Sequence, residues 1–445
     1  MKLFNTYTNK LEDFHSIKEN QVSMYVCGPT VYNYIHIGNA RPVVVFDTLR
    51  RFFEAKGYTV RFASNFTDVD DRIIQKAIDE HKSEAEVSAF YIEQFIKDLE
   101  RLGCKTDYIK PRVTEYIAQI IGYIGELVSL DFAYVVNGDV FFRVGKIDEY
   151  GTLSNRKLDD LISGARVEVN PDKESPLDFV LWKKTDVGLA WDSRFSRGRP
   201  GWHTECVVMI DDIFKGEIDI HGGGSDLIFP HHENEIAQAY ALHEHHVARY
   251  WLHNGRLNIE GEKMSKSLGN FILVKDFPGD MMAFRLFLLS THYRAPLNFN
   301  TEAFHAIQND WMKTYQAYQT LFRTLDLADA FGSDMEVYDP DIRAMIDDFD
   351  HHLEQDLNTP NAISVLQALV KTINTQLRKD ADIVLLKQSF KALGYMLSIL
   401  GLSISLSLLS SEDKELYRKW EQMRKAKDFE QADRLRQLLQ EKNIV

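Results

Sequence analysis

Hydrophobic residues near the N-terminus change from a continuous run to helical spacing and back, and this change predicts a βαβ unit. The apolar run at residues 22–27 is typical of a short buried strand. At residues 40–56, apolar positions return at intervals of three and four, which predicts a helix that ends at Gly57. A second strand is expected at residues 59–63. Strand, helix and strand in this order favour a parallel sheet.

The pattern changes twice more along the chain. Short strands and turns at residues 130–200 indicate an insertion, after which a strand resumes at 219–221 and helical spacing follows at 229–243. From about Thr301 onward the pattern is almost wholly helical. We therefore predict an α/β fold with a parallel sheet, an insertion and a helical C-terminal region.

Composition narrows the class of protein. The 445 residues are 44% hydrophobic and 27% charged, as expected for a globular chain of two to four domains. No membrane span is expected: the nearest apolar stretch, residues 394–409, is short and contains four serines. Residues 1–10 lack the apolar segment of a secretory signal. Three cysteines, Cys27, Cys104 and Cys206, cannot form a disulfide framework, so a reducing, cytoplasmic setting is expected.

The net charge of −14 argues against indiscriminate binding to nucleic acid. Its distribution is uneven, since residues 326–356 contain eleven acidic residues and one basic residue. We interpret this block as a solvated linker and helix face. The last helical pattern, residues 413–445, carries nine basic and seven acidic residues, which leaves a local basic surface open.

A first chemical motif, His36-Ile37-Gly38-Asn39, stands in the loop that enters the first predicted helix. Loops at the carboxyl ends of parallel strands bind nucleotides, and a helix N-terminus favours phosphate. Gly38 leaves room for a flat base, while His36 and Asn39 can donate hydrogen bonds to a phosphate. The alternative is a loop histidine with a purely structural hydrogen bond.

A second motif, Lys263-Met264-Ser265-Lys266-Ser267, combines two lysines with two serines between Gly261 and Gly269. Lysine supplies a mobile point charge for phosphate oxygens, and the glycines can serve as hinges. An ordinary charged surface loop is the alternative for this pentapeptide taken alone.

Four further residues suit a metal ion. Cys27 ends the first strand, Cys206 lies far along the chain, and His231 and Glu235 are four residues apart and so share one helix face. Two thiolates, an imidazole and a carboxylate form a plausible zinc site. Because His232 is three residues from Glu235, spacing alone does not choose between the histidines. The alternative is two buried free cysteines.

Both motifs in this order resemble those of a class I aminoacyl-tRNA synthetase, and the surrounding stretches closely resemble the cysteinyl-tRNA synthetases. Asn39 replaces the histidine that more commonly ends the first motif, but asparagine can still donate to phosphate. Family members often continue beyond the position of Val445, which leaves the anticodon contacts open. The likeness is dense over residues 25–270, with matching stretches at 25–32, 65–71, 199–206 and 221–235, and thinner afterwards, at 347–366 and 424–434.

The resemblance implies activation of L-cysteine by ATP and transfer to a cysteine tRNA by a cytoplasmic monomer, with one Zn²⁺ per chain and Mg²⁺ carried with ATP. It implies a Rossmann-type catalytic domain in two halves, residues 1–130 and 201–255, separated by an inserted connective segment, 131–200. A lysine-loop stem-contact domain at 256–315, a helical anticodon-side domain at 316–405 and a C-terminal helix region at 406–445 would follow. The implied site residues are His36, Asn39, Lys263 and Lys266 for catalysis; Gly38, Ser265, Ser267 and Asp226 for ATP; Gly28, Thr67 and Trp202 for the amino-acid pocket; and Cys27, Cys206, His231 and Glu235 for zinc.

Two rival functions remain open at this stage. A ligase that joins cysteine to an amino-sugar would share the ATP motifs and the zinc site, although the long helical C-terminal half favours tRNA. A non-catalytic zinc-binding or RNA-binding paralogue would have no need of His36, Lys263 and Lys266, which are all present.

Overall fold

The computed structural model describes most of the chain and divides it into two compact units. The first unit comprises Met1–Gln308 with His351–Asn361 and Ile399–Gly401, and the second comprises Asn309–Asp350, Ala362–Ser398 and Leu402–Val445. The described residues are 1–156, 171–263, 271–331, 337, 339–379, 381–442 and 444.

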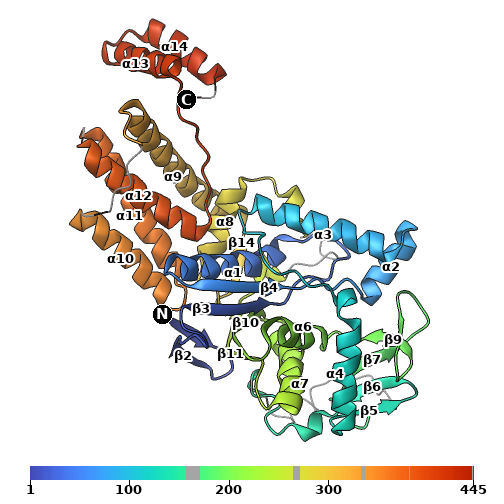
Figure 1. Cartoon of the computed structure of the whole chain (residues 1–445). Helices are drawn as coiled ribbons and strands as arrows, with labels where there is room; N and C mark the ends of the chain where they lie inside the picture. The colour runs from blue at the N-terminus through green and yellow to red at the C-terminus, as the bar shows by residue number, and fades with distance from the viewer. Residues whose placement is uncertain are drawn as a thin grey trace. The chain divides into compact units, whose positions relative to one another are not determined.

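A four-stranded parallel sheet forms the centre of the first unit (Figure 1). Its strand order is β11-β10-β3-β4, so β3 pairs with β4 on one side and with β10 on the other. The order therefore changes direction between β3 and β10, and α/β sheets bind ligands outside the carboxyl ends of the strands at such a point. The predicted βαβ unit and parallel sheet are confirmed. The strands are β3 (Gln21–Val26), β4 (Thr59–Ser64), β10 (Ile218–Gly224) and β11 (Ala248–Asn254).

Helix α1 (Ile37–Ala55) connects β3 to β4 and begins three residues earlier than its apolar spacing predicts. The earlier start arises because His36 caps the helix, which the hydrophobic pattern cannot show. Gly57 has a φ of 89° and follows the C-cap residue Lys56. A left-handed residue suits glycine, so the chain turns away from the helix at the residue that the sequence indicates.

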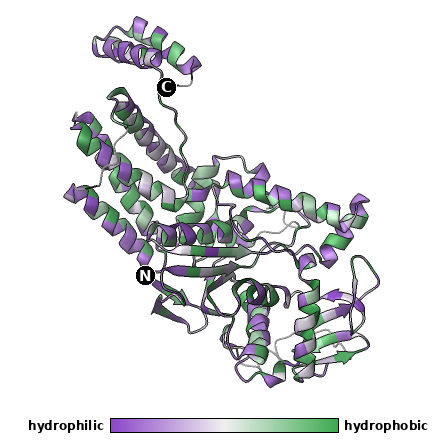
Figure 2. Cartoon of the chain, in the orientation of Figure 1, coloured by the Kyte–Doolittle hydropathy of each residue, from purple (hydrophilic) through white to green (hydrophobic). Residues whose placement is uncertain are grey.

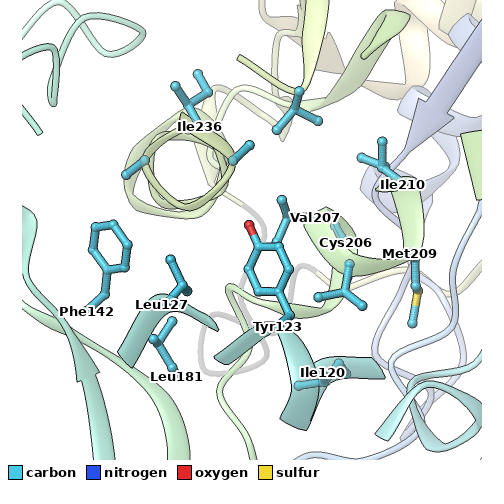
Figure 3. Close-up of a cluster of buried hydrophobic side chains, with 14 of the residues drawn as sticks. Ile120, Tyr123, Leu127, Phe142, Leu181, Cys206, Val207, Met209, Ile210 and Ile236 are labelled. Carbon is cyan, nitrogen blue, oxygen red and sulfur yellow. The ribbon is translucent and has the colours of Figure 1, made fainter. Parts of the chain in front are cut away.

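The insertion between the halves of the sheet forms an antiparallel sheet in the order β5-β6-β7-β9-β8. This confirms the predicted short strands for the described part, and residues 157–170 lie outside it. Side chains of this sheet pack with helices α4, α6 and α7 in one hydrophobic cluster, which includes Leu127, Phe142, Val207 and Ile236 (Figure 3). The packing fixes the two helices that carry candidate metal ligands. The elements are β5 (Ala133–Val136), β6 (Asp139–Phe142), β7 (Phe179–Lys184), β8 (Trp191–Asp192), β9 (Arg197–Pro200), α4 (Ile117–Ser129), α6 (Glu205–Phe214) and α7 (Glu233–His243).

Smaller elements complete the first unit. A three-stranded sheet joins β12 to β14 in parallel and to β13 in antiparallel fashion. A π-helical turn, Ile228–His232, precedes α7, so this helix begins four residues later than its spacing predicts. Phe229 has extended backbone angles, which interrupt the helix there. The remaining elements are β1 (Lys2–Asn5), β2 (Lys10–Asp13), α2 (Asp71–Glu80), α3 (Glu84–Arg101), β12 (Leu257–Ile259), β13 (Glu262–Lys263), α8 (Met281–Leu289), β14 (Leu297–Phe299) and the 3₁₀ turns Val113–Glu115, Val144–Lys146 and Val274–Asp276.

The C-terminal region is helical, and its first helix begins at Thr301 as predicted. The expectation of one continuous helical pattern over residues 413–445 is wrong, because the chain breaks between α13 and α14. Lys427 adopts a left-handed φ of 60°, and the Asp428 side chain accepts a hydrogen bond from the backbone N–H of Gln431, which starts a new helix. The helices are α9 (Thr301–Leu327), α10 (Pro340–Glu354), α11 (Thr359–Arg378), α12 (Ile383–Leu400), α13 (Ser411–Lys425) and α14 (Phe429–Glu441).

One helix of the described chain, α12, is long and apolar enough to cross a membrane by length and composition, with a mean hydropathy of 1.3. This helix begins eleven residues before the stretch 394–409 that was expected to come nearest to a membrane span. Half of α12 is buried inside the protein, and Leu393, Met396 and Leu397 are each at most 3% exposed. A buried core helix of a soluble protein has these properties.

Candidate active site and metal centre

Four side chains predicted as metal ligands converge beside the carboxyl ends of the central strands. Cys27 follows β3, and Cys206 lies in the first turn of α6. His231 lies in the π-helical turn, and Glu235 lies in the first turn of α7. The two sulfur atoms are 3.6 Å apart, and the His231 Nε2 atom lies 2.9 Å from a Glu235 carboxylate oxygen. One ligand atom from each residue lies within 4.8 Å of the other three. The arrangement is compact enough for one metal ion.

A second set of four shares two of these residues. His221 and His232 also approach Cys27 and Glu235, again with ligand atoms within 4.8 Å of one another. The His232 Nε2 atom is 3.2 Å from the Cys27 sulfur, while its Nδ1 atom is 2.7 Å from His253 Nε2. The ligand distances, like the sequence spacing, therefore do not choose between His231 and His232. Only the set with His231 contains both cysteines.

Burial makes the electrostatics of this cluster strong. Burial by itself would lower the pKa of His231, but the Glu235 carboxylate and Cys206 raise it to about 10. Burial would raise the pKa of Glu235, yet His221 and His231 hold it well below its ordinary value. The hydrogen bond from Cys27 lowers the pKa of Cys206 to about 6 against the effect of burial, whereas burial raises that of Cys27. The Glu235 carboxylate and the His231 imidazolium thus stabilise each other's charged forms inside the protein.

Aromatic and polar side chains hold the candidate ligands in place. The Trp202 ring stacks on His231, with the ring centres 4.4 Å apart and the planes 20° apart, and 42% of Trp202 is exposed. His203 Nδ1 lies 3.1 Å from the Nδ1 atom of His231. The Nε2 atom of His221 lies 2.6 Å from the second oxygen of Glu235. Such outer contacts orient metal ligands.

The end of β4 approaches the end of β3 from the other side. The Gly28 backbone N–H donates to the Asn65 side-chain oxygen at 2.8 Å. A Cβ atom on Gly28 would lie only 1.6 Å from the Asn65 carbonyl oxygen, so only glycine fits this approach. The buried Thr67 hydroxyl donates to Glu205 at 2.7 Å. These contacts fix the position of Cys27 relative to the neighbouring strand.

A cavity of about 730 Å³ opens beside the cluster. Its volume suits a small-molecule ligand. Among the described residues, Thr67 does not line it, since its hydroxyl is turned to Glu205. The candidate site residues on the cavity wall are Cys27, Gly28, His36, Gly38, Asn39, Trp202 and Asp226.

The first motif forms the N-terminus of α1. The Gly38 backbone N–H donates to His36 Nδ1 at 3.1 Å, and the Asn39 side-chain oxygen accepts from the His36 backbone N–H at 3.2 Å. In a neutral imidazole the proton is then on Nε2, the donor that a phosphate requires. The structural hydrogen bond of a loop histidine and a donor for phosphate thus coexist in His36.

The lysine motif is only partly described. The backbone of Lys263 ends β13, while Ser265, Lys266 and Ser267 lie outside the described residues. The segment that follows them pairs with the first motif: the Ile37 N–H donates to the carbonyl of Ile272 at 3.0 Å, and the Val274 N–H donates to that of Ile35 at 3.0 Å. The backbone of the first motif is therefore joined to the segment that follows the lysine motif in the sequence.

Several residues of the site were missed in the sequence analysis. Arg72, Asn254 and Arg256 line the cavity, and His221 and Glu205 support the metal cluster. Asn254 ends the buried strand β11, where a polar residue is a usable signal, and His221 is a polar residue in the middle of the buried strand β10. Arg72 follows directly on a stretch that carried the family resemblance. Glu205 lies inside the stretch 199–206 that carried the family resemblance, but no role was assigned to it there.

Comparisons with known proteins find relatives over the whole length of the chain. The family model for the tRNA synthetases class I (C) catalytic domain matches residues 13–309, and that for the DALR domain matches residues 343–405. A cysteine–tRNA ligase of Geobacillus thermodenitrificans is 45% identical, covering 100% of this chain and 96% of the relative. One of Acholeplasma laidlawii is 42% identical and covers 100% of both chains.

Solved structures show the fold at lower identity. A methionyl-tRNA synthetase of Mycobacterium tuberculosis in complex with methionyl-adenylate matches with a TM-score of 0.60 at 15% identity, over 85% of this chain and 89% of that one. A LeuRS–tRNA–LeuAMS ternary complex of Agrobacterium radiobacter matches with a TM-score of 0.61 at 12% identity, over 89% and 87%. The class I synthetase fold is thus shared by the catalytic and helical parts of these chains.

Proposed function

This chain belongs to the cysteine–tRNA ligase family of class I tRNA synthetases, and we propose that it activates L-cysteine with ATP and transfers it to a cysteine tRNA. One observation carries the proposal beyond family membership. Cys27, one of two thiols in a cluster suited to a metal, lines the same cavity as the N-terminus of α1. The amino acid and the nucleotide can therefore meet in one chamber, where we place the reaction.

We propose one Zn²⁺ per chain, held by Cys27, Cys206, His231 and Glu235. This set offers both thiols together with an imidazole and a carboxylate, and zinc prefers sulfur and nitrogen ligands. When bound, zinc lowers the pKa of the substrate thiol and binds the thiolate more tightly than the hydroxyl of serine. His221 orients Glu235, and Trp202 holds the ring plane of His231.

Cysteine activation requires no protein nucleophile. A substrate carboxylate oxygen forms a bond to the α-phosphorus of ATP, and the bond to the leaving pyrophosphate breaks. We assign phosphate contacts to His36 Nε2–H and to the Asn39 side-chain amide at the N-terminus of α1, where the helix dipole favours anions. Lys263 and Lys266 add positive charge, with Mg²⁺ carried by ATP.

The remaining site residues have binding roles in this proposal. Gly38, Asp226, Ser265 and Ser267 contact ATP, and Gly38 and Asp226 line the cavity. A terminal ribose hydroxyl of the tRNA then attacks the adenylate carbonyl and releases AMP. The enzyme is expected to act as a cytoplasmic monomer. Gly28 and Trp202 line the cysteine pocket, and Thr67 supports it through Glu205.

We also retain the division of the chain as a proposal. Residues 1–130 and 201–255 form the catalytic domain, and 131–200 form the inserted segment. Residues 256–315, 316–405 and 406–445 form the stem-contact, anticodon-side and C-terminal parts respectively.

An aminoacylation assay tests the proposed function. We expect ATP–pyrophosphate exchange that depends on cysteine and not on serine, together with cysteine attachment to purified cysteine tRNA. Exchange without charging, but with transfer of cysteine to an amino-sugar, would instead identify the sugar ligase. The absence of any cysteine-dependent exchange from a metal-loaded protein would leave only the non-catalytic paralogue.

The two C-terminal helices present a second candidate surface. They carry mostly hydrophilic residues with scattered hydrophobic ones (Figure 2). The Arg424 guanidinium lies 4.7 Å from the centre of the Trp420 ring, and 68% of Phe429 is exposed. Single-stranded RNA is bound by such aromatic and basic side chains. A groove on α13 and α14 is lined by Trp420, Glu421, Arg424, Lys425, Phe429, Ala432, Asp433 and Arg436.

We expect Arg424→Glu to raise the tRNA concentration needed for charging by about tenfold, because it replaces an attractive phosphate contact with a repulsive one. Cysteine-dependent pyrophosphate exchange should remain unchanged, and the wild-type affinity for tRNA should fall with salt. Arg434→Glu is the matched control, since Arg434 lies on the same hairpin but does not line the groove. Equal tRNA affinities in all three proteins would assign this hairpin a structural role.

A further inference from the structure

Arg41 lies in the second turn of α1 and is fully buried. Its guanidinium donates to the carbonyl oxygens of Gly255 and Ala295, each at 2.7 Å, of His292 at 3.1 Å and of Arg256 at 3.3 Å. In the described part of the chain, no carboxylate forms an ion pair with it. Burial lowers the pKa of Arg41 to about 10, so the side chain still carries its charge at neutral pH.

A buried charge without a counter-ion is unfavourable, and carbonyl dipoles compensate it only in part. A smaller uncharged side chain in the same place would avoid that desolvation. The guanidinium has one property that an apolar side chain lacks: its planar fork of donors holds several backbone segments at fixed separations. Here it holds two segments that are distant in sequence against one helix.

The two segments lie side by side at Gly255 and lead into the parallel strands β12 and β14. Its N–H donates to the Tyr293 carbonyl at 2.8 Å, and the Leu297 N–H donates to the Arg256 carbonyl at 2.9 Å. A Cβ atom on Gly255 would lie 2.4 Å from the Ala295 carbonyl oxygen, so this close backbone contact requires glycine. Arg41 therefore stabilises a contact between two backbone segments that are too close together for any side chain at position 255.

The backbone contact at Gly255 fixes part of the wall of the cavity in which we place ATP. Asn254, Arg256 and Leu257 lie on the cavity wall, and β12 and β13 lead from them to Lys263. Helix α1 itself begins at the His36 motif. One side chain thus connects the helix of the first ATP motif, a wall of the cavity and the root of the lysine motif.

We propose that Arg41 is a positioning residue for ATP, which fixes the Asn254–Leu257 wall and the start of the lysine motif relative to the N-terminus of α1. The inference rests on the proposed use of ATP by this cavity. It assigns Arg41 no contact with substrate. The consequence is a selective role: the candidate metal ligands are not among the four hydrogen-bond partners of Arg41. Loss of the fork should therefore weaken ATP binding and leave cysteine binding and the metal content unchanged.

The test compares Arg41→Met and Arg41→Lys by cysteine-dependent pyrophosphate exchange and by calorimetric titration with ATP. We expect Arg41→Met to raise the KM and Kd for ATP by about tenfold or more, since small misplacements of a binding wall have effects of this order. The KM for cysteine and the metal content should stay within twofold of wild type. Arg41→Lys keeps the charge but not the fork, so it should lie between the two.

Arg323→Met is the matched control, because Arg323 is also buried and donates to a backbone carbonyl, that of Ser407, within the second unit. It should lower the temperature of unfolding without changing the KM for ATP. Gly255→Ala provides a second test, since it displaces the same backbone contact without removing a charge. It should also lower the affinity for ATP. If Arg41→Met fails to fold, Arg41→Lys and Gly255→Ala carry the test.

An unchanged KM and Kd for ATP in the folded Arg41 variants and in Gly255→Ala would overturn the inference. So would equal losses for ATP and cysteine, which indicate a general structural defect. Failure of the proposed function is recognised separately, because wild-type protein would then show no cysteine-dependent exchange, while ATP binding by calorimetry would still report on Arg41.

Discussion

Replacing Cys206 by serine is expected to remove most of the bound zinc and to lower kcat/KM for cysteine by more than about a hundredfold, because loss of contacts that merely support metal ligands already costs 10–100-fold. A serine hydroxyl is not deprotonated at neutral pH and is a far poorer ligand for zinc than a thiolate. Cys206 is 2% exposed, so water cannot readily take its place. Metal analysis and pyrophosphate exchange over a range of cysteine concentrations provide the measurements.

Cys104→Ser is the control for this substitution. Cys104 is also buried, but its sulfur accepts a hydrogen bond from Arg285 at 3.2 Å and belongs to neither metal-ligand set. We expect this variant to retain zinc and cysteine affinity. Cys206→Ser should also lower the affinity for cysteine more than the affinity for ATP. Full zinc occupancy with unchanged cysteine kinetics in Cys206→Ser would refute the ligand assignment.

Replacing Lys266 by alanine is expected to slow adenylate formation about a hundredfold at saturating ATP, since removal of one contact to developing charge typically costs about 3 kcal/mol. The reason is that charge builds on the phosphate oxygens as pyrophosphate leaves, so the lysine matters most in the transition state. Single-turnover measurement of cysteinyl-adenylate isolates that step.

Lys275→Ala is the matched control for the lysine motif. Lys275 follows the motif closely, but its ammonium lies over the Tyr34 ring, 4.5 Å from the ring centre. We expect a change of less than about threefold, since an exposed cation–π contact contributes only about 0.5–1 kcal/mol. If Lys266→Ala changes only the affinity for ATP, the contact is equally strong in the ground state and the catalytic assignment is wrong.

Ligand types were easier to predict than the geometry that selects among them. Cys27, Cys206 and Glu235 stand out by residue type, and the resemblance supplied His231. His232 has a similar spacing, and the structure brings its Nε2 atom to 3.2 Å from the Cys27 sulfur. The contacts that orient these histidines, His253 against His232 and Trp202 against His231, depend on strands and turns that are distant in sequence. No local pattern contains that information.

The hydrophobic pattern by itself determined β3, α1, β4 and the helical C-terminal region, because the period of apolar residues reflects which face of a local element is buried. It did not locate the break at Lys427, where a left-handed residue and the Asp428 cap override a helical pattern. The role of Arg41 was equally hidden, since one arginine in a helix is ordinary until its four carbonyl partners are known. The break at Lys427 is local, but an apolar period does not report a left-handed residue. The role of Arg41 was decided by the tertiary structure, because its carbonyl partners lie more than 200 residues away along the chain and meet the helix only in the folded protein.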